Sequence, residues 1–336
     1  MSSKALVDGH GRTVRDLRIS VTDRCNFRCQ YCMPEEGMTW LPKSEVLTFE
    51  EIERVARVGV ERFGFDGIRI TGGEPTVRAH LPVLIEKLAR LRVGGDGPGV
   101  DLAMTTNGAS LRLLAADLRH AGLRRINISC DSLRPERFLE LTRRDALDRV
   151  LDGVEAAIEA GFDPVKLNVV LVRGSNDDEI VDLAAYGRDR GVTVRFIEFM
   201  PLDASDEWGP NRVVPADEVV AALDAAFGIR PLDERGDQPA ERFVYHDGRG
   251  EVGVIASVTR PFCASCDRVR LTAEGQFRNC LFAVRETDLR AILRNGGSDD
   301  DLAAAMAADV AAKWAGHAIG KVHFIKPERS MSQIGG

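Results

Sequence analysis

The 336-residue sequence lacks the features that would take a chain into or across a membrane. No apolar run approaches the roughly 20 residues that span a bilayer. Residues 1–11 contain no apolar segment of the kind found in a secretory signal. Low-complexity stretches and long internal repeats are also missing. We therefore expect a globular cytoplasmic protein. Thiols stay reduced in that compartment, so we interpret the cysteines as metal ligands rather than as disulfides.

The sequence also lacks an excess of positive charge and a phosphate-binding loop. Its 45 Lys and Arg stand against 52 Asp and Glu, giving a net charge of -7, so there is no basic field for a nucleic acid polymer. No GxxxxGK[ST] motif is present, and Gly95, Gly97 and Gly99 precede a predicted strand, unlike a dinucleotide fingerprint. Any nucleotide must therefore be held by side chains and turns.

Three cysteines lie close together after an apolar segment, in the sequence Cys25-Asn-Phe-Arg-Cys29-Gln-Tyr-Cys32. This first cysteine set has no fourth cysteine or histidine nearby, since His10 lies well upstream. Three thiolates without a fourth ligand suit a [4Fe–4S] cluster with one iron open to a small molecule. Zinc usually takes four ligands and favours C-x2-C pairs. We therefore favour the cluster over zinc, a disulfide or inert core cysteines.

A second cysteine set lies in the last third of the chain, where Cys263 and Cys266 form a C-x2-C pair and Cys280 follows. Read alone, this spacing is also compatible with part of a zinc ribbon. Few candidates for a fourth ligand are present, and a second cluster with an open iron suits that shortage better. The remaining Cys130 follows a predicted strand alone, and we expect it to be a small buried residue.

Strand-like and helical patterns alternate over about 190 residues. The predicted strands are 17–21, 67–70, 100–104, 125–129, 165–171 and 193–198. The predicted helices are 48–63, 80–91, 111–121, 135–141, 146–160 and 177–188. Such alternation implies parallel strands with right-handed crossovers, and six units are fewer than a closed eight-fold barrel needs. The expected fold is therefore α/β, a partial (β/α)6 TIM-type barrel that something else closes.

The pattern changes after about residue 203. An irregular loop at 203–210, a helix at 215–227 and a linker at 232–240 precede short strands at 242–246, 252–256 and 269–272 and helices at 288–293 and 301–314. We expect these residues to form a smaller α+β domain on the open side of the barrel. The predicted units are an N-terminal extension at 1–15, the partial barrel at 16–232, the C-terminal domain at 233–325 and a tail at 326–336.

Polar and glycine-rich turns follow the predicted strands, at 71–74, 105–108, 129–132 and 199–201. Because the carboxyl ends of parallel strands meet at one face of a barrel, these turns and the first cysteine set should converge. Arg268 and Arg270, two apart on a predicted strand, should share a face. Inward-facing arginines in an acidic protein indicate an anionic ligand such as a polyphosphate, although surface ion pairs would account for most Lys and Arg residues.

Together these motifs resemble the radical S-adenosylmethionine (SAM) GTP 3′,8-cyclase family, which opens molybdenum cofactor biosynthesis. CxxxCxxC with an aromatic residue before its last cysteine is similar to the radical SAM signature. The second cysteine set and the Gly-Gly end make the resemblance more specific, and it extends from about Arg15 to Gly336. The matching segments are 23–34, 69–75, 105–108, 127–129, 195–200, 262–270, 280–282 and 335–336.

The resemblance implies roles for individual residues. The first set would hold a [4Fe–4S] cluster whose open iron chelates SAM, and the second a cluster whose open iron faces the guanine of GTP. The implied SAM contacts are Tyr31, Gly73, Ser129 and Met200, with Arg195 as a further candidate. The implied GTP contacts are Arg18, Arg69, Thr105, Lys166, Arg268, Val269 and Arg270. The implied catalytic residues are Arg18, Arg268, Arg270 and the tail residues Gly335 and Gly336, which would enter the active site.

The implied reaction is a radical cyclisation by a lyase. Reductive cleavage of SAM gives methionine and a 5′-deoxyadenosyl radical, which removes hydrogen from ribose C3′ of GTP. C3′ then adds to guanine C8, giving (8S)-3′,8-cyclo-7,8-dihydro-GTP. The enzyme would need an external one-electron donor but no membrane, and it would act as a monomer or a homodimer. Two alternatives stay open, namely a peptide-modifying radical SAM enzyme with an auxiliary cluster and a zinc-stabilised binding module without catalysis.

Overall fold

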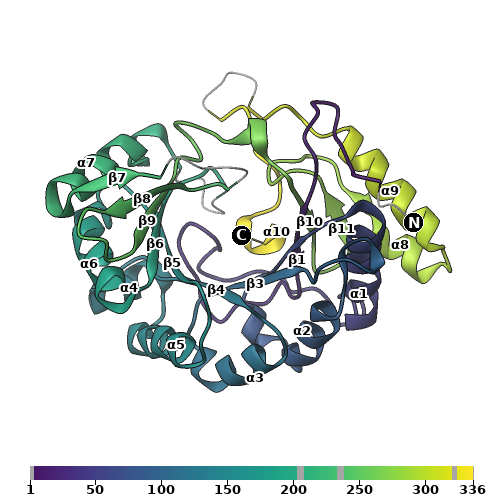
Figure 1. The fold of residues 1–336 in the computed structure, drawn as a ribbon, viewed down its shortest axis with the longest axis horizontal. Helices are drawn as coiled ribbons and strands as arrows, with labels where there is room; N and C mark the ends of the chain where they lie inside the picture. The colour runs from purple at the N-terminus through teal and green to yellow at the C-terminus, as the bar shows by residue number, and fades with distance from the viewer. Residues whose placement is uncertain (1–3, 203–207, 233–237, 320–323, 336) are drawn as a thin grey trace.

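One continuous twelve-stranded sheet organises the computed structural model, which describes residues 4–202, 208–232, 238–319 and 324–335. The order of the strands is β12-β11-β10-β1-β2-β3-β4-β5-β6-β9-β8-β7. Figure 1 shows this sheet curving around the C-terminal end of the chain, with most of the helices on its outer side. The sheet is therefore an open barrel with a polar inner face and an apolar outer face.

The bounds of the elements follow the alternation expected from the sequence. The strands are β1 (Asp16–Ser20), β2 (Gly67–Thr71), β3 (Asp101–Thr106), β4 (Arg125–Ser129), β5 (Val165–Leu171), β6 (Thr193–Glu198), β7 (Ile229–Pro231), β8 (Glu241–Tyr245), β9 (Glu251–Ile255), β10 (Arg268–Leu271), β11 (Gln276–Arg278) and β12 (Thr287–Asp288). The α-helices are α1 (Phe49–Arg57), α2 (Leu81–Ala89), α3 (Ala115–His120), α4 (Pro135–Thr142), α5 (Leu147–Glu159), α6 (Ile180–Arg190), α7 (Ala216–Phe227), α8 (Leu289–Arg294), α9 (Asp299–Ala311) and α10 (Met331–Ile334). None of the described helices is both long and apolar enough to cross a membrane.

All six strands predicted before residue 200 are present, and β1 to β6 pair in parallel in chain order. Their residues alternate between the two faces of the sheet, because successive side chains of a strand point to opposite sides. The outward positions are apolar and buried against the helices, as at Ile68, Ile126 and Leu167, which have no exposed surface. The predicted partial barrel is therefore confirmed.

The C-terminal part of the chain extends this sheet at both edges. β9 pairs in parallel with β6, and β10 pairs in parallel with β1. Antiparallel strands then continue outward on each side, β8 and β7 beyond β9 and β11 and β12 beyond β10. The short strands β7, β11 and β12 were not predicted, because two or three residues show no period. The domain boundaries predicted from the sequence stay a proposal.

Helix α9 ends earlier than its pattern predicts, at Ala311 rather than at residue 314. Its start is fixed by a capping box, in which Ser298 and Asp301 exchange hydrogen bonds between side chain and backbone. The residues after the helix, Lys313–His317, leave the helical path and pack against the second cysteine set. The four-residue helix α10 near the C-terminus was also not predicted, because a single turn is too short to show a helical period.

A buried carboxylate joins the barrel to the C-terminal strands. Glu198, at the end of β6, is 2% exposed. Its Oε1 accepts hydrogen bonds from the N–H of Ala216 at 3.0 Å and from Oγ1 of Thr259 at 2.5 Å. Its Oε2 accepts from the N–H groups of Val258 at 2.7 Å and Thr259 at 2.8 Å. One side chain therefore accepts hydrogen bonds from backbone N–H groups both at the start of α7 and after β9.

Replacing Glu198 with alanine should lower the free energy of unfolding by about 3–5 kcal/mol, because buried N–H groups lose their acceptor. Denaturant unfolding monitored by circular dichroism measures the change. The matched control is Glu218→Ala on the exposed side of α7, where an ion pair with Arg173 is lost and a change of about 1 kcal/mol or less is expected. Equal stability of the two variants would contradict this account of the junction.

Candidate active site

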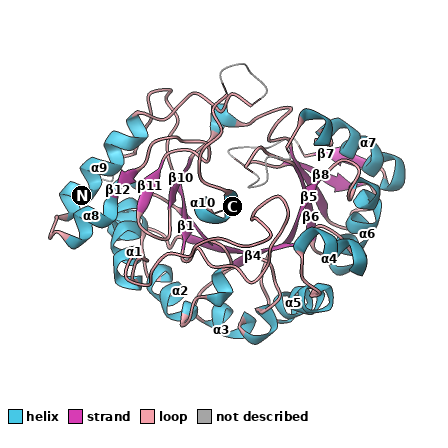
Figure 2. Ribbon diagram, turned by 180° about the vertical axis from the view of Figure 1, so that it is seen from behind, coloured by secondary structure: helices cyan, strands magenta, loops and turns pink. Residues whose placement is uncertain are grey.

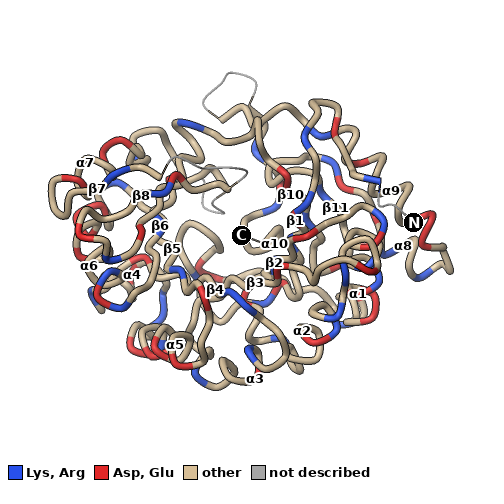
Figure 3. Tube along the Cα trace, in the orientation of Figure 1, with Lys and Arg blue, Asp and Glu red and all other residues tan. Residues whose placement is uncertain are grey.

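The inner face of the sheet is lined by cations, which occupy alternate positions of its strands. Arg18 lies opposite both Arg69 and Arg270 in the strand register. On β1, β2, β4, β5, β6 and β10 the inward cations are Arg18, Arg69, Arg125, Lys166, Arg195, Arg268 and Arg270. On these strands and β3, the only inward carboxylates are Asp16 and Asp101. Figure 3 marks basic and acidic positions along the chain.

Positive charge exceeds negative charge on this inner face of the sheet. Burial, together with the neighbouring Arg268, lowers the pKa of Arg18 to about 10. Burial, together with Arg195 and Arg125, lowers the pKa of Lys166 to about 7. The buried Nε of Arg18 and Oδ1 of Asp16 have no hydrogen-bond partner, 3.7 Å apart. Crowded cations with an unsatisfied buried donor indicate a site for a polyanion.

Two amides link the inward polar residues across β3 to β6. Arg195 donates from Nη2 to Oδ1 of Asn127 at 2.8 Å and from Nε to Oδ1 of Asn168 at 2.9 Å. Asn127 donates in turn from Nδ2 to Oγ1 of Thr105 at 3.3 Å. Burial, with Arg69 as the first of the neighbouring cations, lowers the pKa of Arg195 to about 9. The predicted residues Thr105 and Arg195 therefore belong to one network.

The first cysteine set lies on the loop after β1, beside the apolar core. Burial raises the pKa of the Cys25 thiol to about 11 and that of Cys32 to about 12. The pKa of Cys29 also rises, through burial and through the proximity of the other two sulfurs. The N–H of Phe27 donates to Sγ of Cys25 at 3.3 Å. Three buried thiols with raised pKa values suit an iron–sulfur centre, because bound iron stabilises their thiolates.

The glycine-rich turns meet at this loop, as predicted. Glu74 accepts hydrogen bonds from the hydroxyl of Thr106 at 2.7 Å and from the N–H of Asn107 at 2.6 Å. Asn107 donates to Oδ1 of Asn26, within the first cysteine set, at 2.8 Å. A side chain at Gly73 would place its Cβ 2.4 Å from the carbonyl oxygen of Arg24. Glycine is therefore required here by the backbone of the cysteine loop itself.

Tyr31 is tied to the ends of two strands through a residue that sequence reasoning did not single out. Its hydroxyl donates to Oδ2 of Asp131 at 2.5 Å, and the N–H of Val170 donates to Oδ1 at 2.8 Å. Burial raises the pKa of Asp131 to about 6. The sequence signal that could have identified Asp131 is its position just after the end of a strand. Ser129 ends β4 on the same inner face, and Met200 lies two residues after β6.

The second cysteine set lies at the opposite end of the inner face, around β10 and β11. Cys263 and Cys266 precede β10, and Cys280 follows β11. The N–H of Phe282 donates to Sγ of Cys280 at 3.4 Å, the same arrangement as at Cys25. Among the described residues, no three His, Cys, Asp or Glu side chains are grouped so as to hold one metal ion. A zinc ion needs all of its ligands around one atom, whereas a cluster binds each thiolate through a different iron.

The C-terminal tail joins the first cysteine set to the cationic strand β10. Ser332, in α10, hydrogen-bonds to the sulfur of Cys32. Ser20 at the end of β1 donates to the carbonyl of Ile334 at 3.2 Å, and Arg270 donates to the carbonyl of Gly335. Figure 2 shows α10 inside the curve of the sheet. The tail therefore reaches the predicted site, while Gly336 lies outside the described residues.

Cys130 and Val269 are both buried, with different consequences for their predicted roles. Cys130 is 1% exposed, so its prediction as a small buried residue is confirmed. Val269, placed among the GTP contacts, has a fully buried side chain that faces the outer side of β10, so only its backbone faces the interior. Sequence reasoning also missed Arg125 and Asp101, which form an ion pair on the inner face. The two-residue period of their strands was the signal.

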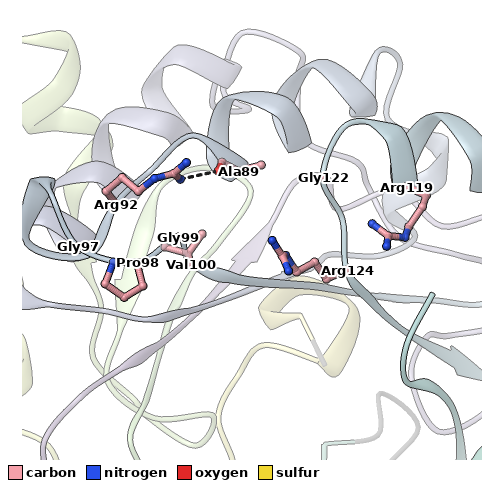
Figure 4. Close-up of a pocket in the computed structure, with 9 residues that line it drawn as sticks. All are labelled: Ala89, Arg92, Gly97, Pro98, Gly99, Val100, Arg119, Gly122 and Arg124. Atoms are coloured by element: carbon pink, nitrogen blue, oxygen red, sulfur yellow. Dashed lines mark hydrogen bonds between the residues drawn. The ribbon is translucent and has the colours of Figure 1, made fainter. Parts of the chain in front are cut away.

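A cavity of about 490 Å³ lies away from this inner face. Figure 4 shows its lining, which includes Arg92, Arg119 and Arg124. The remaining lining residues belong to the segments just before β3 and β4 and to the end of α2. None of the residues that line this cavity belongs to the predicted site, so the cavity is not part of it.

Comparison with known proteins identifies the family to which the chain belongs. The model of the radical SAM superfamily matches residues 19–187, and the model "Molybdenum Cofactor Synthesis C" matches residues 192–319. A GTP 3′,8-cyclase of Streptomyces coelicolor is 48% identical over 98% of this chain and 96% of that protein. The chain belongs to the GTP 3′,8-cyclase family. A second member of this family, from Rhodopirellula baltica, is 51% identical over 99% of this chain and 92% of its own.

The fold is shared more widely than the family. SuiB of Streptococcus suis, solved with S-adenosylmethionine bound, matches with a TM-score of 0.59 at 14% identity, over 84% of this chain and 67% of that one. At this identity the likeness shows the fold alone. The radical SAM family membership accounts for the first cysteine set, and the second family model covers the second cysteine set as well.

Replacing Gly73 with alanine should displace the cysteine loop, because the added Cβ would overlap the backbone at Arg24. Iron bound after anaerobic reconstitution should fall, and the free energy of unfolding should drop by about 1–3 kcal/mol. Gly99→Ala is the matched control, since its Cβ would meet only the guanidinium of Arg92 at 3.2 Å. Wild-type iron content and stability in the Gly73 variant would show that the packing is not required.

Proposed function

We propose that this chain is a GTP 3′,8-cyclase, a radical SAM lyase that converts GTP to (8S)-3′,8-cyclo-7,8-dihydroguanosine 5′-triphosphate. This reaction would be the first step of molybdenum cofactor biosynthesis. The observation that carries the proposal is the arrangement of two three-cysteine sets around one cation-rich interior. The names of the relatives, at 46–51% identity over nearly the whole chain, agree with it.

The residues present fit two iron–sulfur clusters. Each set offers three cysteines that are not in disulfides, and in each set one sulfur accepts a hydrogen bond from the N–H two residues later. Cys25, Cys29 and Cys32 would hold the first cluster, and Cys263, Cys266 and Cys280 the second. When bound, a cluster with one open iron supplies the chelation and one-electron reductive cleavage of SAM. The unpaired cysteines agree with a reducing compartment, for which we propose the cytoplasm.

The cationic inner face would hold the triphosphate of GTP. Arg18, Arg268 and Arg270 lie on adjacent strands, so their guanidinium groups can approach several phosphate oxygens at once. Arg69 adds charge on β2, next to β1, and Lys166 adds charge on β5, further along the sheet. Binding a polyanion would relieve the repulsion that lowers the pKa of several of these groups. Ribose C3′ and guanine C8 belong to the same molecule, so the protein would contribute orientation by holding GTP in a conformation that brings these two atoms together.

SAM would lie beside the first cysteine set, near the carboxyl ends of the strands. Tyr31, Ser129 and Met200 are the proposed contacts there. Tyr31 is held in place by Asp131 and lies edge-on to Phe199, with ring centroids 6.5 Å apart. The tail, anchored by Arg270, would exclude water from the space between SAM and GTP, protecting a reactive radical. An external one-electron donor is part of the proposal.

Anaerobic incubation with SAM, a one-electron reductant and GTP should yield the cyclic nucleotide with methionine and 5′-deoxyadenosine, identified by mass spectrometry. Cys266→Ser should bind about four iron per chain instead of about eight, and should lose the cyclic product while still cleaving SAM slowly. Cys130→Ser, in which a cysteine outside both sets is changed, should retain both clusters. Unchanged GTP in the wild-type reaction would exclude the proposed activity.

GTP binding should take up a proton at Lys166. Below pH 7 this lysine is already charged, whereas above pH 7 it must acquire a proton to pair with phosphate, so affinity should fall by up to about tenfold per pH unit as the pH rises. Isothermal titration at pH 8 in two buffers of different ionisation enthalpy measures the uptake. Lys166→Met should abolish it, and Lys87→Met, a surface change in α2, should not. Equal proton uptake by all three proteins would refute the role of Lys166.

A further inference from the structure

The segment Lys313–His317, just after α9, forms a wall of the second cysteine set. Nζ of Lys313 lies 3.7 Å from Sγ of Cys266 and donates to the carbonyl of Arg268 at 2.7 Å. The backbone of His317 hydrogen-bonds to the sulfur of Cys263. Figure 1 shows α9 beside β11, so the segment enters the site from the outer side of the sheet. Because β11 and β1 pair with opposite edges of β10, α9 lies on the side of β10 that is opposite to β1.

The segment can approach the sulfurs closely because it has a glycine, Gly316, beside Cys263. A Cβ at Gly316 would lie 2.9 Å from Cβ and 3.3 Å from Sγ of Cys263. The ring of His317 packs on Phe282, with centroids 5.1 Å apart, and Phe282 donates its N–H to Cys280. Residues 313–317 therefore contact the surroundings of all three cysteines.

A buried arginine locks the segment onto the cysteine loop. Arg12 donates to the carbonyl of Cys263 at 2.6 Å, to that of Ala315 at 2.9 Å and to that of Trp314 at 2.5 Å. Its own charge is neutralised by Asp8, whose Oδ2 lies 2.5 Å from its Nε. Arg12 thus fixes the position of the backbone that carries Lys313 while adding no uncompensated charge.

Lys313 differs from Arg12 in having no carboxylate partner among the described residues. It is 3% exposed, and its contacts are the sulfur of Cys266 and one carbonyl. A buried ammonium group without an anion is costly, so the anion that balances it must be the ligated sulfurs of the second set. Arg268 on β10 also hydrogen-bonds to Cys266, so Lys313 is a second cation at this sulfur, and it comes from outside the strands.

We propose that Lys313 is a positioning residue that compensates the charge of the second iron–sulfur cluster and hydrogen-bonds to its Cys266 ligand. The inference rests on the proposed second cluster. A cation beside a cluster ligand stabilises the reduced, more negative state, so Lys313 raises the reduction potential of that cluster relative to one without it.

The test compares Lys313→Met, Lys313→Arg and Lys87→Met with the wild type after anaerobic reconstitution, by iron content and by potentiometric titration followed by electron paramagnetic resonance. Lys313→Met should retain the first-cluster signal, and its second cluster should either have a more negative potential or be lost, leaving about four iron per chain. Lys313→Arg should keep a potential near the wild type, and Lys87→Met should be unchanged.

The outcomes separate this inference from the proposed function. A wild-type protein with only one four-iron cluster would remove the second cluster and with it the proposed cyclase site. A wild type with two clusters, together with a Lys313→Met variant whose second cluster has an unchanged potential, would overturn the role of Lys313 alone. A Lys313→Arg variant as strongly altered as Lys313→Met would also overturn it, because its charge is conserved.

Discussion

The repulsion among buried cations on the inner face of the sheet is the constraint on which the site depends. Parallel strands point every second residue inward, and on this chain that register carries arginines and a lysine with few carboxylates between them. The apolar alternate positions pack against the helices and hold the strands in register regardless of this cost. The apolar outer face therefore provides the stability that keeps like charges together until a polyanion binds.

The geometry of the two cysteine sets follows from how the sheet is assembled. The first set follows β1, and the second flanks β10, which is hydrogen-bonded to β1 along its length. Residues about 250 positions apart in sequence therefore lie on adjacent strands. The tail then contacts Cys32 of the first set, Ser20 on β1 and Arg270 on β10. A rigid sheet thus fixes the two sets relative to one another.

Much of this could be predicted from sequence, for identifiable reasons. The first six strands have clear periods, and the turns after them converge because parallel strands end at one face. The end of α9 could not be predicted, since the apolar pattern of the helix continues past Ala311 while the backbone departs to reach the cysteines. Lys313 and Arg12 were missed for a related reason. Their partners are backbone carbonyls and a sulfur far along the chain, and such contacts leave no local pattern.

The order of strands also bears on how the chain folds during synthesis. Both edges of the β1–β6 core are covered by strands that emerge later, β10 on one side and β9 on the other. A nascent chain that has reached only Glu198 therefore presents two unpaired strand edges, the kind of surface that templates aggregation. Their closure needs contacts of large sequence separation, which form slowly. Until the last third of the chain is synthesised, these two edges therefore stay open to pairing with other strands.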